Sequence, residues 1–320
     1  MQSPFLRIKP IGNMGNQMLQ YMFALRVRQL VGQLEIAGYD IEPWGLHSSP
    51  YRDMRRTSLY LGGHLLDVDH IASLFRRGIV RDVTLAGLGF KLGNYAPVDF
   101  YRQVFKADHI AAEGYGSDAV VINIRGAEVL GGIHRDYGPI PFSYIDAVIE
   151  NSGARPVFLG QIGDDAYSRL LRDRYPQAEF QPSRGALIDF EILRRSHQIS
   201  MSVSTFSWLA CWLSDARIIH YPMQGMFNPQ QRPDIELTPI DDPRYRFYEC
   251  EQRSWAGSEA DLASLSVARD HPLLSPDRLH ALQWEQRSKL RFYSAWRRAR
   301  VDFKARFINR QTKPAESAAA

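Results

Sequence analysis

The sequence predicts an α/β protein with two domains, each built around a parallel sheet. The chain has 320 residues, which is longer than a typical single domain, so two domains of roughly 100–150 residues are expected. Near the N-terminus, a short extended segment, a glycine turn, a helical pattern and a second extended segment follow one another. Strand-like and helix-like segments alternate again from residue 118 to residue 221. Such alternation is typical of parallel α/β domains.

The first predicted domain covers residues 1–116 and opens with a short extended segment. The turn Gly12-Asn-Met-Gly-Asn-Gln follows this segment. A helix is expected over residues 17–30, because apolar side chains recur on one side of it. The next strand is expected at Leu34-Glu-Ile-Ala, whereas the pattern between residues 43 and 114 is irregular.

The second predicted domain covers residues 117–283 and begins with the run Asp118-Ala-Val-Val-Ile-Asn-Ile-Arg. A largely apolar run of this kind is typical of a strand that is buried on both faces of a parallel sheet. Further helices are expected at 142–150, 165–174, 186–195 and 206–214, and further strands at 156–160, 178–180, 198–203 and 216–221. Residues 314–320 are expected to form a disordered tail.

Composition excludes several classes of protein. No stretch approaches the roughly 20 apolar residues that cross a bilayer, and the first residues lack the layout of a signal peptide. Cys211 and Cys250 lie far apart, and the nine histidines form no paired ligand spacing. Cys211 lies in an apolar segment, which favours a core residue over a reactive thiol. The sequence therefore predicts a cytoplasmic protein with no metal site and no bound cofactor.

A basic segment follows the second predicted domain, over residues 284–313. It carries ten lysines and arginines against only two acidic residues, and aromatic side chains are interleaved with these charges at near-helical intervals. Two interpretations stay open. The segment is either a terminal helix packed on the body with a solvated basic face, or a helix that lies on anionic lipid and makes the protein peripheral at an inner membrane. Nucleic acid is not an expected partner, because the rest of the chain has no recognisable reader motif.

The first candidate site is the turn from Gly12 to Gln17. Two glycines between a strand and a helix allow a tight turn and the close approach of an anion to the backbone, and the helix start adds a partial positive charge. The third glycine of a dinucleotide-binding motif is absent, since Asn16, Gln17 and Met18 follow Gly15. An ordinary turn between strand and helix is therefore the alternative.

The second candidate is Arg125, directly after the buried strand that begins at Asp118. Open α/β sheets bind ligands beyond the carboxyl ends of their strands. A guanidinium at this position can grip a diphosphate and stabilise the charge that develops as a nucleotide leaves. A salt bridge at a domain interface is the structural alternative.

The third candidate is the segment Ser202-Val-Ser-Thr-Phe-Ser-Trp, which opens an apolar helix. Hydroxyl groups at a helix start either cap the helix or bind phosphate, and both roles use the same geometry. Both interpretations remain open for this segment.

Together the three segments resemble those of a known enzyme family. Gly12-Asn-Met-Gly-Asn-Gln-Met-Leu-Gln-Tyr is similar to the N-terminal signature of the bacterial α-1,2-fucosyltransferases. Asn123-Ile-Arg-Gly-Ala-Glu resembles the His-x-Arg-Arg-x-Asp motif of the wider α-1,2/α-1,6/protein O-fucosyltransferase group. Asp189-Phe-Glu-Ile-Leu and the segment from Ser202 look like the third motif of that group, and the resemblance extends over residues 6–225.

The resemblance implies a GT-B fold, in which two Rossmann-like domains face each other across a cleft. It also implies an inverting glycosyltransferase that takes a sugar from a GDP-sugar without an essential metal. GDP-fucose is the leading donor, and a hydroxyl of a bacterial surface glycan or oligosaccharide is the expected acceptor.

The resemblance also implies roles for individual residues. Arg125 would grip the β-phosphate of the donor. The Gly12 turn, the Gly15 backbone and the Asn16 side chain would line the cleft beside the diphosphate or the acceptor. The other predicted contacts to phosphate, nucleotide or base are Asn123, Asp189, Ser204, Thr205 and Phe206.

Three positions depart from the second motif. Asn123 stands in place of histidine, Gly126 in place of the second arginine, and Glu128 in place of aspartate. One arginine alone then offsets the leaving diphosphate, so a different nucleotide sugar and a non-catalytic binding relative are the alternative functions. Glu128, His134 and Asp136 are the candidate general bases, against the alternative that each belongs to a solvated loop.

One metal-binding motif is set aside. Asp67-Val-Asp69 matches the Asp-x-Asp pattern that holds Mg²⁺ or Mn²⁺ in another glycosyltransferase fold. It lacks the strand-end context that this chemistry needs, so no metal ligand is predicted there.

Overall fold

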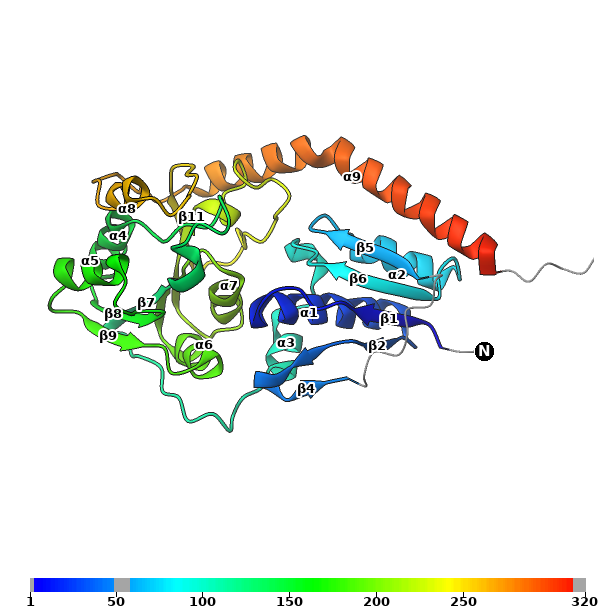
Figure 1. The fold of residues 1–320 in the computed structure, drawn as a ribbon, viewed down its shortest axis with the longest axis horizontal. Coiled ribbons are helices and arrows are strands. Elements are labelled where there is room, and N and C mark those ends of the chain that lie inside the picture. The colour runs from blue at the N-terminus through cyan, green and yellow to red at the C-terminus, as the bar shows by residue number, and fades with distance from the viewer. Residues whose placement is uncertain (1–2, 49–57, 313–320) are drawn as a thin grey trace, which may run out of the picture. The chain divides into compact units, whose positions relative to one another are not determined.

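The computed structural model describes residues 3–48 and 58–312, and its contacts divide the chain into two compact units (Figure 1). The first unit comprises the residues up to Tyr101 together with those from Ser288 onward, and the second runs from Arg102 to Arg287. The tail predicted at residues 314–320 lies outside the described residues.

The first unit contains a four-stranded parallel sheet with the strand order β2-β1-β6-β5. Its strands are β1 (Phe5–Ile8), β2 (Glu35–Ala37), β5 (Leu59–Gly63) and β6 (Asp82–Gly87). Its helices are α1 (Met14–Val31) and α2 (Val68–Arg76), and a short hairpin is formed by β3 (Asp40–Ile41) and β4 (Leu46–His47). The boundary between the two units falls within α3 (Val98–Val104). The core comes from β6 and α1, whose apolar side chains, such as Leu85, Met22 and Phe23, are fully buried.

The last helix of the described chain, α9 (Pro276–Thr312), begins upstream of the predicted segment. From Ser288 onward it belongs to the first unit, and polar contacts attach it there. His70 Nε2 lies 2.8 Å from a carboxylate oxygen of Asp302, and Arg298 pairs with Asp67. Ala305 is fully buried. One face of the helix is therefore packed on the first unit.

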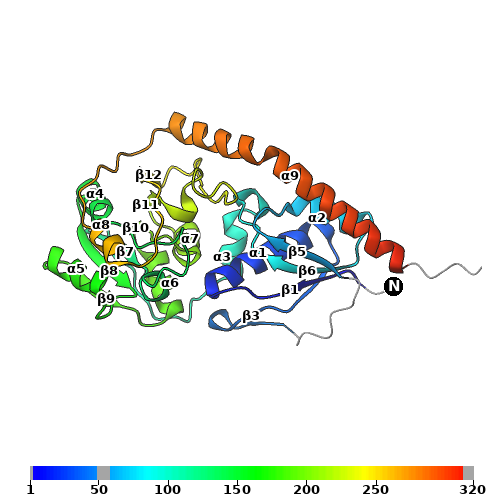
Figure 2. The same ribbon diagram turned by 45° about the horizontal axis from the view of Figure 1, so that its top comes forward.

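The second unit contains a six-stranded parallel sheet with the order β12-β11-β10-β7-β8-β9, whose strands lie side by side in Figure 2. The strands are β7 (Ala119–Ile124), β8 (Arg155–Gly160), β9 (Glu179–Pro182), β10 (Gln198–Ser200), β11 (Ile218–Met223) and β12 (Tyr245–Glu249). The helices wholly within this unit are α4 (Phe142–Ser152), α5 (Ala166–Arg174), α6 (Ala186–Arg195), α7 (Thr205–Trp212) and α8 (Glu259–Ser264). Every residue of β7 is buried, as a central parallel strand requires.

The strand order reverses direction at β7. The chain runs from β7 outward through β8 to β9, and then returns to β10 on the other side of β7. In open α/β sheets the crevice at such a switch point, beyond the carboxyl ends of the strands, is where ligands bind. In this sheet the switch point lies between the ends of β7 and β10.

The two units meet in the sequence between Tyr101 and Arg102, and the segment that follows α3 packs on α6. The Arg195 guanidinium donates to the carbonyls of Ala107, Ile110 and Ala112. A side chain at Gly114 would collide with the Arg195 backbone, since a Cβ there would lie 2.2 Å from its carbonyl carbon and oxygen.

The predicted α/β class is confirmed, because both main sheets are parallel and are connected through helices. Among residues 3–48 and 58–312, no helix combines the length and the apolar character that crossing a bilayer would need.

Candidate functional site at the switch point of the second sheet

A buried hydrogen bond connects two of the predicted motifs at the switch point. The Ser202 hydroxyl donates to Asn123 Oδ1 at 2.8 Å, and the Asn123 amide donates to the Leu159 carbonyl at 3.1 Å. Asn123 therefore links the carboxyl ends of β7, β8 and β10. It is 4% exposed, and both its amide oxygen and its amide nitrogen are hydrogen-bonded within the protein.

The segment from Ser202 to Ser207 begins α7 with a network of hydroxyl groups. Ser204 Oγ accepts from the Ser207 amide at 3.1 Å and so caps the helix. Ser207 Oγ in turn accepts from the Ser202 amide at 3.0 Å, and the hydroxyls of Ser202 and Ser204 lie 3.2 Å apart. The capping alternative thus describes Ser204 in this structure. The N-terminal turn of α7 still directs backbone N–H groups away from the helix at the edge of the sheet where ligands bind.

Phe206, which was predicted to contact nucleotide, is half-buried and packs edge-on against Phe190 of α6, with 5.5 Å between ring centroids. Thr205 is also half-buried, at the first position of α7. This contact joins α7 to α6, the helix that carries Asp189.

Arg125 follows β7 directly and forms an ion pair with Glu128. The Arg125 side chain is 24% exposed and that of Glu128 38%, so both can reach solvent. Glu128 lies in a single turn of 3-10 helix (Ala127–Val129), and Ala127 before it has a φ of 47°. This left-handed residue turns the chain so that Glu128 meets the guanidinium three residues earlier.

Gly126, which stands where the related motif has a second arginine, packs tightly against the loop after β8. Its amide donates to Gln161 Oε1 at 3.0 Å. A Cβ at this position would lie 2.8 Å from the Gln161 carbonyl oxygen, a distance that real Cβ atoms do not show. The local backbone therefore has no room for an arginine at residue 126.

Asp189 lies in the first turn of α6, beside the loop that follows β9, and is 4% exposed. Its carboxylate accepts hydrogen bonds from the Ser183 hydroxyl and from the Arg184 amide, the latter at 3.1 Å. β9 is two strands away from β7 in the sheet. In this structure Asp189 holds the β9–α6 loop, and its predicted contact to the base end of a nucleotide stays a prediction.

The candidate bases differ in their surroundings. Asp136 accepts from Gln231 Nε2 and Arg232 Nη1, each at 3.2 Å, so its carboxylate is already paired. His134 is exposed, with its ring 5.2 Å from that of Tyr137. Glu128 alone among them contacts Arg125. Glu128 therefore is the candidate nearest to the proposed phosphate-binding cation.

The glycine turn lies in the first unit, between β1 and α1. Gly12 has a φ of 64°, and a Cβ on it would lie 2.5 Å from Asn16 Nδ2, so the turn requires glycine. α1 begins at Met14 rather than at the predicted Gln17, which places the buried Gly15 and the half-buried Asn16 in its first turn.

Gln20 fixes this turn, a role that the sequence did not reveal. Its side chain is fully buried, accepts from the Ile11 amide at 3.1 Å, and donates to the carbonyls of Lys9 and Gly87 at 3.0 and 3.3 Å. A glutamine within an otherwise apolar helical stretch was the available signal, since a buried amide needs partners.

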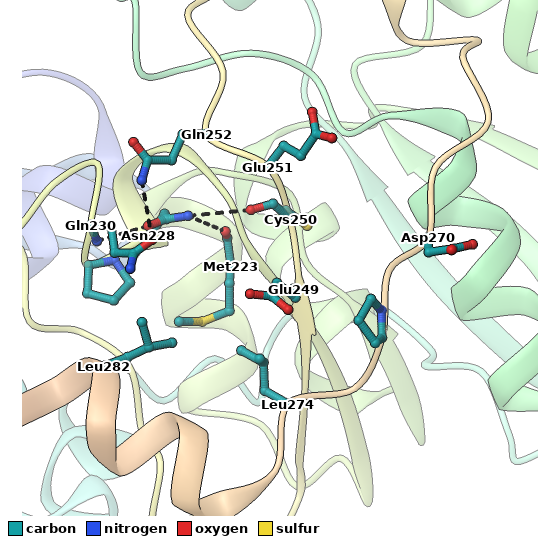
Figure 3. Close-up of a pocket in the computed structure, with 12 residues that line it drawn as sticks. Met223, Asn228, Gln230, Glu249, Cys250, Glu251, Gln252, Asp270, Leu274 and Leu282 are labelled. Atoms are coloured by element: carbon teal, nitrogen blue, oxygen red, sulfur yellow. Dashed lines mark hydrogen bonds between the residues drawn. The ribbon is translucent and has the colours of Figure 1, made fainter.

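A cavity of about 580 Å³ lies at the carboxyl ends of β11 and β12 (Figure 3). It is lined by Met223, Asn228, Pro229, Gln230, Glu249, Cys250, Glu251, Gln252, Asp270, Pro272, Leu274 and Leu282. The Asn228 amide, which donates to the Met223 carbonyl at 3.1 Å, supports one side of it. None of the predicted site residues lines this cavity. The sequence pattern predicts neither β12 nor the loops that line the cavity.

Asp67 caps a helix and forms an ion pair. Its carboxylate caps α2 by accepting from the His70 amide at 3.0 Å, and it pairs with Arg298. Burial raises the pKa of this carboxyl, but the His70 amide and the Arg298 and Lys91 cations together hold the pKa below its usual value. Within the described part of the chain, no group of three or more His, Cys, Asp or Glu side chains could hold a metal ion.

Both cysteines are free and buried. Burial raises the pKa of the Cys211 thiol well above its usual range and that of Cys250 to about 12. Neither thiol is a nucleophile at neutral pH.

No known family profile matches the sequence, and no curated protein matches it. Among solved structures, a point mutant of Arabidopsis thaliana FUT1 in complex with GDP matches with a TM-score of 0.43 and 11% identity, over 69% of this chain and 71% of that chain. The iron-containing dodecameric heptosyltransferase TibC in complex with ADP-D-β-D-heptose matches with a TM-score of 0.39 and 15% identity, over 97% and 77%. A further structure of TibC, from enterotoxigenic E. coli, matches with 0.34 and 14% identity, over 76% and 62%. At such low TM-scores, function has to be argued from the chain's own residues.

Proposed function

We propose that the chain is an inverting glycosyltransferase that transfers a sugar, with fucose as the leading candidate, from a GDP-sugar to a hydroxyl of a bacterial surface glycan or oligosaccharide. The observation that carries the proposal is the Ser202–Asn123 hydrogen bond of 2.8 Å. It holds together, at the switch point of a parallel sheet, two segments that separately resemble fucosyltransferase motifs. The switch point is where this class of sheet binds nucleotides.

Arg125 is the residue proposed to bind the β-phosphate of the donor. In an inverting transfer the acceptor oxygen attacks the anomeric carbon, and the bond to the diphosphate oxygen breaks on the opposite face. The leaving diphosphate takes the electron pair, so negative charge grows on its β-phosphate. A partly desolvated guanidinium beside this oxygen stabilises that charge. The first turn of α7 offers backbone N–H groups to the same anion.

Glu128 is proposed to accept the proton of the acceptor hydroxyl. In the structure its carboxylate pairs with the Arg125 guanidinium. A diphosphate that takes over the Arg125 guanidinium releases the Glu128 carboxylate, which is then free to act as a base. The same pair thus couples donor binding to the availability of the base.

The first unit is proposed to supply the acceptor side of the site. The turn at Gly12, the buried Gly15 and the side chain of Asn16 are the residues assigned to this role. A GT-B arrangement of the two units across a cleft belongs to the same proposal, as does catalysis without an essential metal, which an assay in the presence of a chelator tests.

A non-catalytic nucleotide- or glycan-binding protein is the second candidate function. It is favoured by the packing of Gly126, where a Cβ would lie 2.8 Å from the Gln161 carbonyl oxygen and a second arginine therefore has no place. A donor other than GDP-fucose is compatible with the same observation, because fewer cations face the diphosphate.

The test is a calorimetric titration of the full chain with GDP, GDP-fucose, and UDP- and ADP-sugars. The proposal expects GDP binding that Arg125→Ala weakens at least about tenfold, since a hydrogen bond to a charged group contributes roughly 1.5–3 kcal/mol. Arg155→Ala is the matched control. This arginine also forms ion pairs, with Asp118 and Glu179, but it lies at the amino end of β8, on the opposite edge of the sheet.

The outcomes separate the candidates. No affinity for GDP in the wild type would overturn the GDP-sugar proposal, and an ADP- or UDP-sugar that binds instead would identify a different donor. GDP affinity that is equal in Arg125→Ala and Arg155→Ala would remove Arg125 from the site. Donor hydrolysis or transfer to any acceptor in a glycan screen excludes the non-catalytic candidate.

A further inference from the structure

The second half of α9 presents an aromatic stripe to solvent. Phe292, Trp296, Phe303 and Phe307 are 84%, 52%, 74% and 57% exposed. Their spacings of four, seven and four residues return to the same side of a helix with 3.6 residues per turn. Four large apolar side chains are therefore exposed on one outward face of the helix, and exposed apolar surface of this kind marks an interaction site.

The opposite face of the same helix segment is packed on the first unit. Arg297 donates to the Gly62 carbonyl, Asp302 bonds to His70, and Ala305 is fully buried. The orientation of the helix about its own axis is therefore fixed by polar contacts and by burial. The aromatic stripe stays outward as a consequence, and a rotation that buried it would break these contacts.

Positive charges flank the stripe. Lys289 and Arg300 lie at one margin of the aromatic face and Arg306 at the other, as the helical periodicity places them, and all three are exposed. The Arg300 guanidinium lies 5.3 Å from the ring centroid of Trp296. Between Ser288 and Ile308 the acidic residue is Asp302, which is bonded to His70. The outward face therefore carries aromatic and basic side chains without an opposing negative charge.

We propose that this face of α9, from Lys289 to Phe307, docks the protein on an anionic phospholipid surface. The four aromatic side chains enter the boundary between headgroups and acyl chains, and the basic margins contact the lipid phosphates. The stripe is about 22 Å long at 1.5 Å per residue, long enough to lie in the plane of a bilayer surface. The aromatic side chains match the apolar acyl chains, and the basic side chains match the lipid phosphates. A helix that binds at a membrane interface needs both features.

A nucleic acid fits the stripe less well. Nucleic acid would engage the basic margins, but phosphate binding alone makes no use of four aromatic side chains on an outward helix face. The lipid surface uses both the aromatic stripe and its charged margins.

Co-sedimentation of the full chain with vesicles tests the proposal. Vesicles of phosphatidylcholine with phosphatidylglycerol are expected to bind the protein, and vesicles of phosphatidylcholine alone are expected to bind it much more weakly. The triple variant Phe292→Ser/Phe303→Ser/Phe307→Ser is expected to lose anionic-vesicle binding by roughly tenfold or more, because it removes most of the apolar area that enters the interface. The matched control Tyr60→Ser/Val267→Ser replaces exposed apolar side chains elsewhere and should bind as the wild type does.

A charge variant tests the margins separately. Lys289→Gln/Arg300→Gln/Arg306→Gln should weaken binding to anionic vesicles and reduce its sensitivity to salt. A control with the same loss of charge in the second unit is Arg169→Gln/Arg172→Gln/Arg217→Gln.

Circular dichroism and the thermal midpoint confirm that each variant is folded, and the exposed positions make this expected. Absence of wild-type binding to anionic vesicles would overturn the proposal, as would binding that neither variant changes. Equal binding to neutral and anionic vesicles would remove the role of charge. Retention of a DNA duplex without any vesicle binding would instead identify the surface as a nucleic-acid site. None of these outcomes depends on the identity of the sugar donor.

Discussion

The Ser202 hydroxyl donates to Asn123 Oδ1 across 2.8 Å, and this bond joins the ends of two neighbouring parallel strands, β10 and β7. The family that the sequence resembles has histidine at the position of Asn123. In this chain the shorter amide is buried and uses both its oxygen and its nitrogen within the protein. Asn123 therefore fixes the geometry of the switch point through a group that does not titrate.

The first prediction concerns the stability that this amide provides. Asn123→Leu keeps a side chain branched at Cγ but removes the amide that donates to the Leu159 carbonyl and the oxygen that accepts from Ser202. A cost of about 1–3 kcal/mol in the free energy of unfolding is expected, as for other unsatisfied buried groups. Urea unfolding measures it. Asn151→Leu, at an exposed helical position whose amide bonds only within its helix, should cost less than about 0.5 kcal/mol. Equal costs at the two sites would contradict the structural role.

The second prediction concerns the pairing of Arg125 with Glu128. If a diphosphate competes with Glu128 for the guanidinium, Glu128→Gln should tighten GDP binding, by up to about fivefold, because an ion pair of this exposure contributes at most about 1 kcal/mol. The same variant should slow transfer by roughly 10²–10⁴ if Glu128 is the base. Calorimetry measures the GDP affinity, and a transfer assay measures the rate of sugar transfer.

The control for this variant is Glu251→Gln, which removes a carboxylate paired with Arg269 elsewhere in the second unit. GDP affinity should be unchanged there. Weaker GDP binding in Glu128→Gln would show that Glu128 supports the nucleotide site and does not compete for it.

Much of the second sheet could be predicted from the sequence. The apolar run of β7 is buried at every position, and the hydroxyl-rich start of α7 is capped by Ser204 as the pattern allows. Both signals are local: a strand buried on two faces has to be apolar, and a helix start needs an acceptor for its amides. The parallel class follows from these elements and from their alternation.

Other features depend on contacts between distant residues, which the local pattern does not encode. β12 has the sequence Tyr-Arg-Phe-Tyr-Glu and becomes a strand by pairing with β11. The loop after Arg125 is held by Trp255, whose indole donates to the Val129 carbonyl at 2.8 Å from 126 positions further along the chain. The cavity beside Glu249 is built from the same distant segments. The local propensity of a segment does not predict such pairings.

The third prediction tests the close approach at Gly126. Gly126→Ala should lower the free energy of unfolding by about 1–3 kcal/mol, because the added Cβ would meet a backbone carbonyl that cannot turn away. Gly131→Ala is the control, since its nearest contact, the Glu128 carbonyl oxygen, would be at 3.6 Å. A shift of the urea midpoint in the first variant and not in the second is expected. A neutral Gly126→Ala would show that the β8 loop can give way and that a second arginine could be accommodated.

The fourth prediction concerns pH and rests on His220, in the middle of β11. Its Nδ1 lies 2.8 Å from the Tyr248 hydroxyl, and its Nε2 has no hydrogen-bond partner among the described residues. Burial, together with the nearby Arg246 cation, lowers the pKa of this imidazole from 6.5 to about 4. Between these two values the unfolded chain binds a proton that the folded chain does not. The free energy of unfolding therefore rises with pH across this window.

The contribution of His220 to the free energy of unfolding should accordingly be fully present above pH 6.5 and be lost as the pH is lowered toward 4. The loss should reach roughly 3 kcal/mol, at about 1.4 kcal/mol per pKa unit. His220→Gln keeps a hydrogen-bonding group near Tyr248 but cannot take up the proton. Urea unfolding at a series of pH values should then give a flatter dependence for His220→Gln than for the wild type. His280→Gln, which removes an exposed histidine instead, controls for the loss of one imidazole. If His220→Gln and the wild type keep parallel curves between pH 6.5 and 4, the acid sensitivity comes from carboxylates, and the buried imidazole has no part in it.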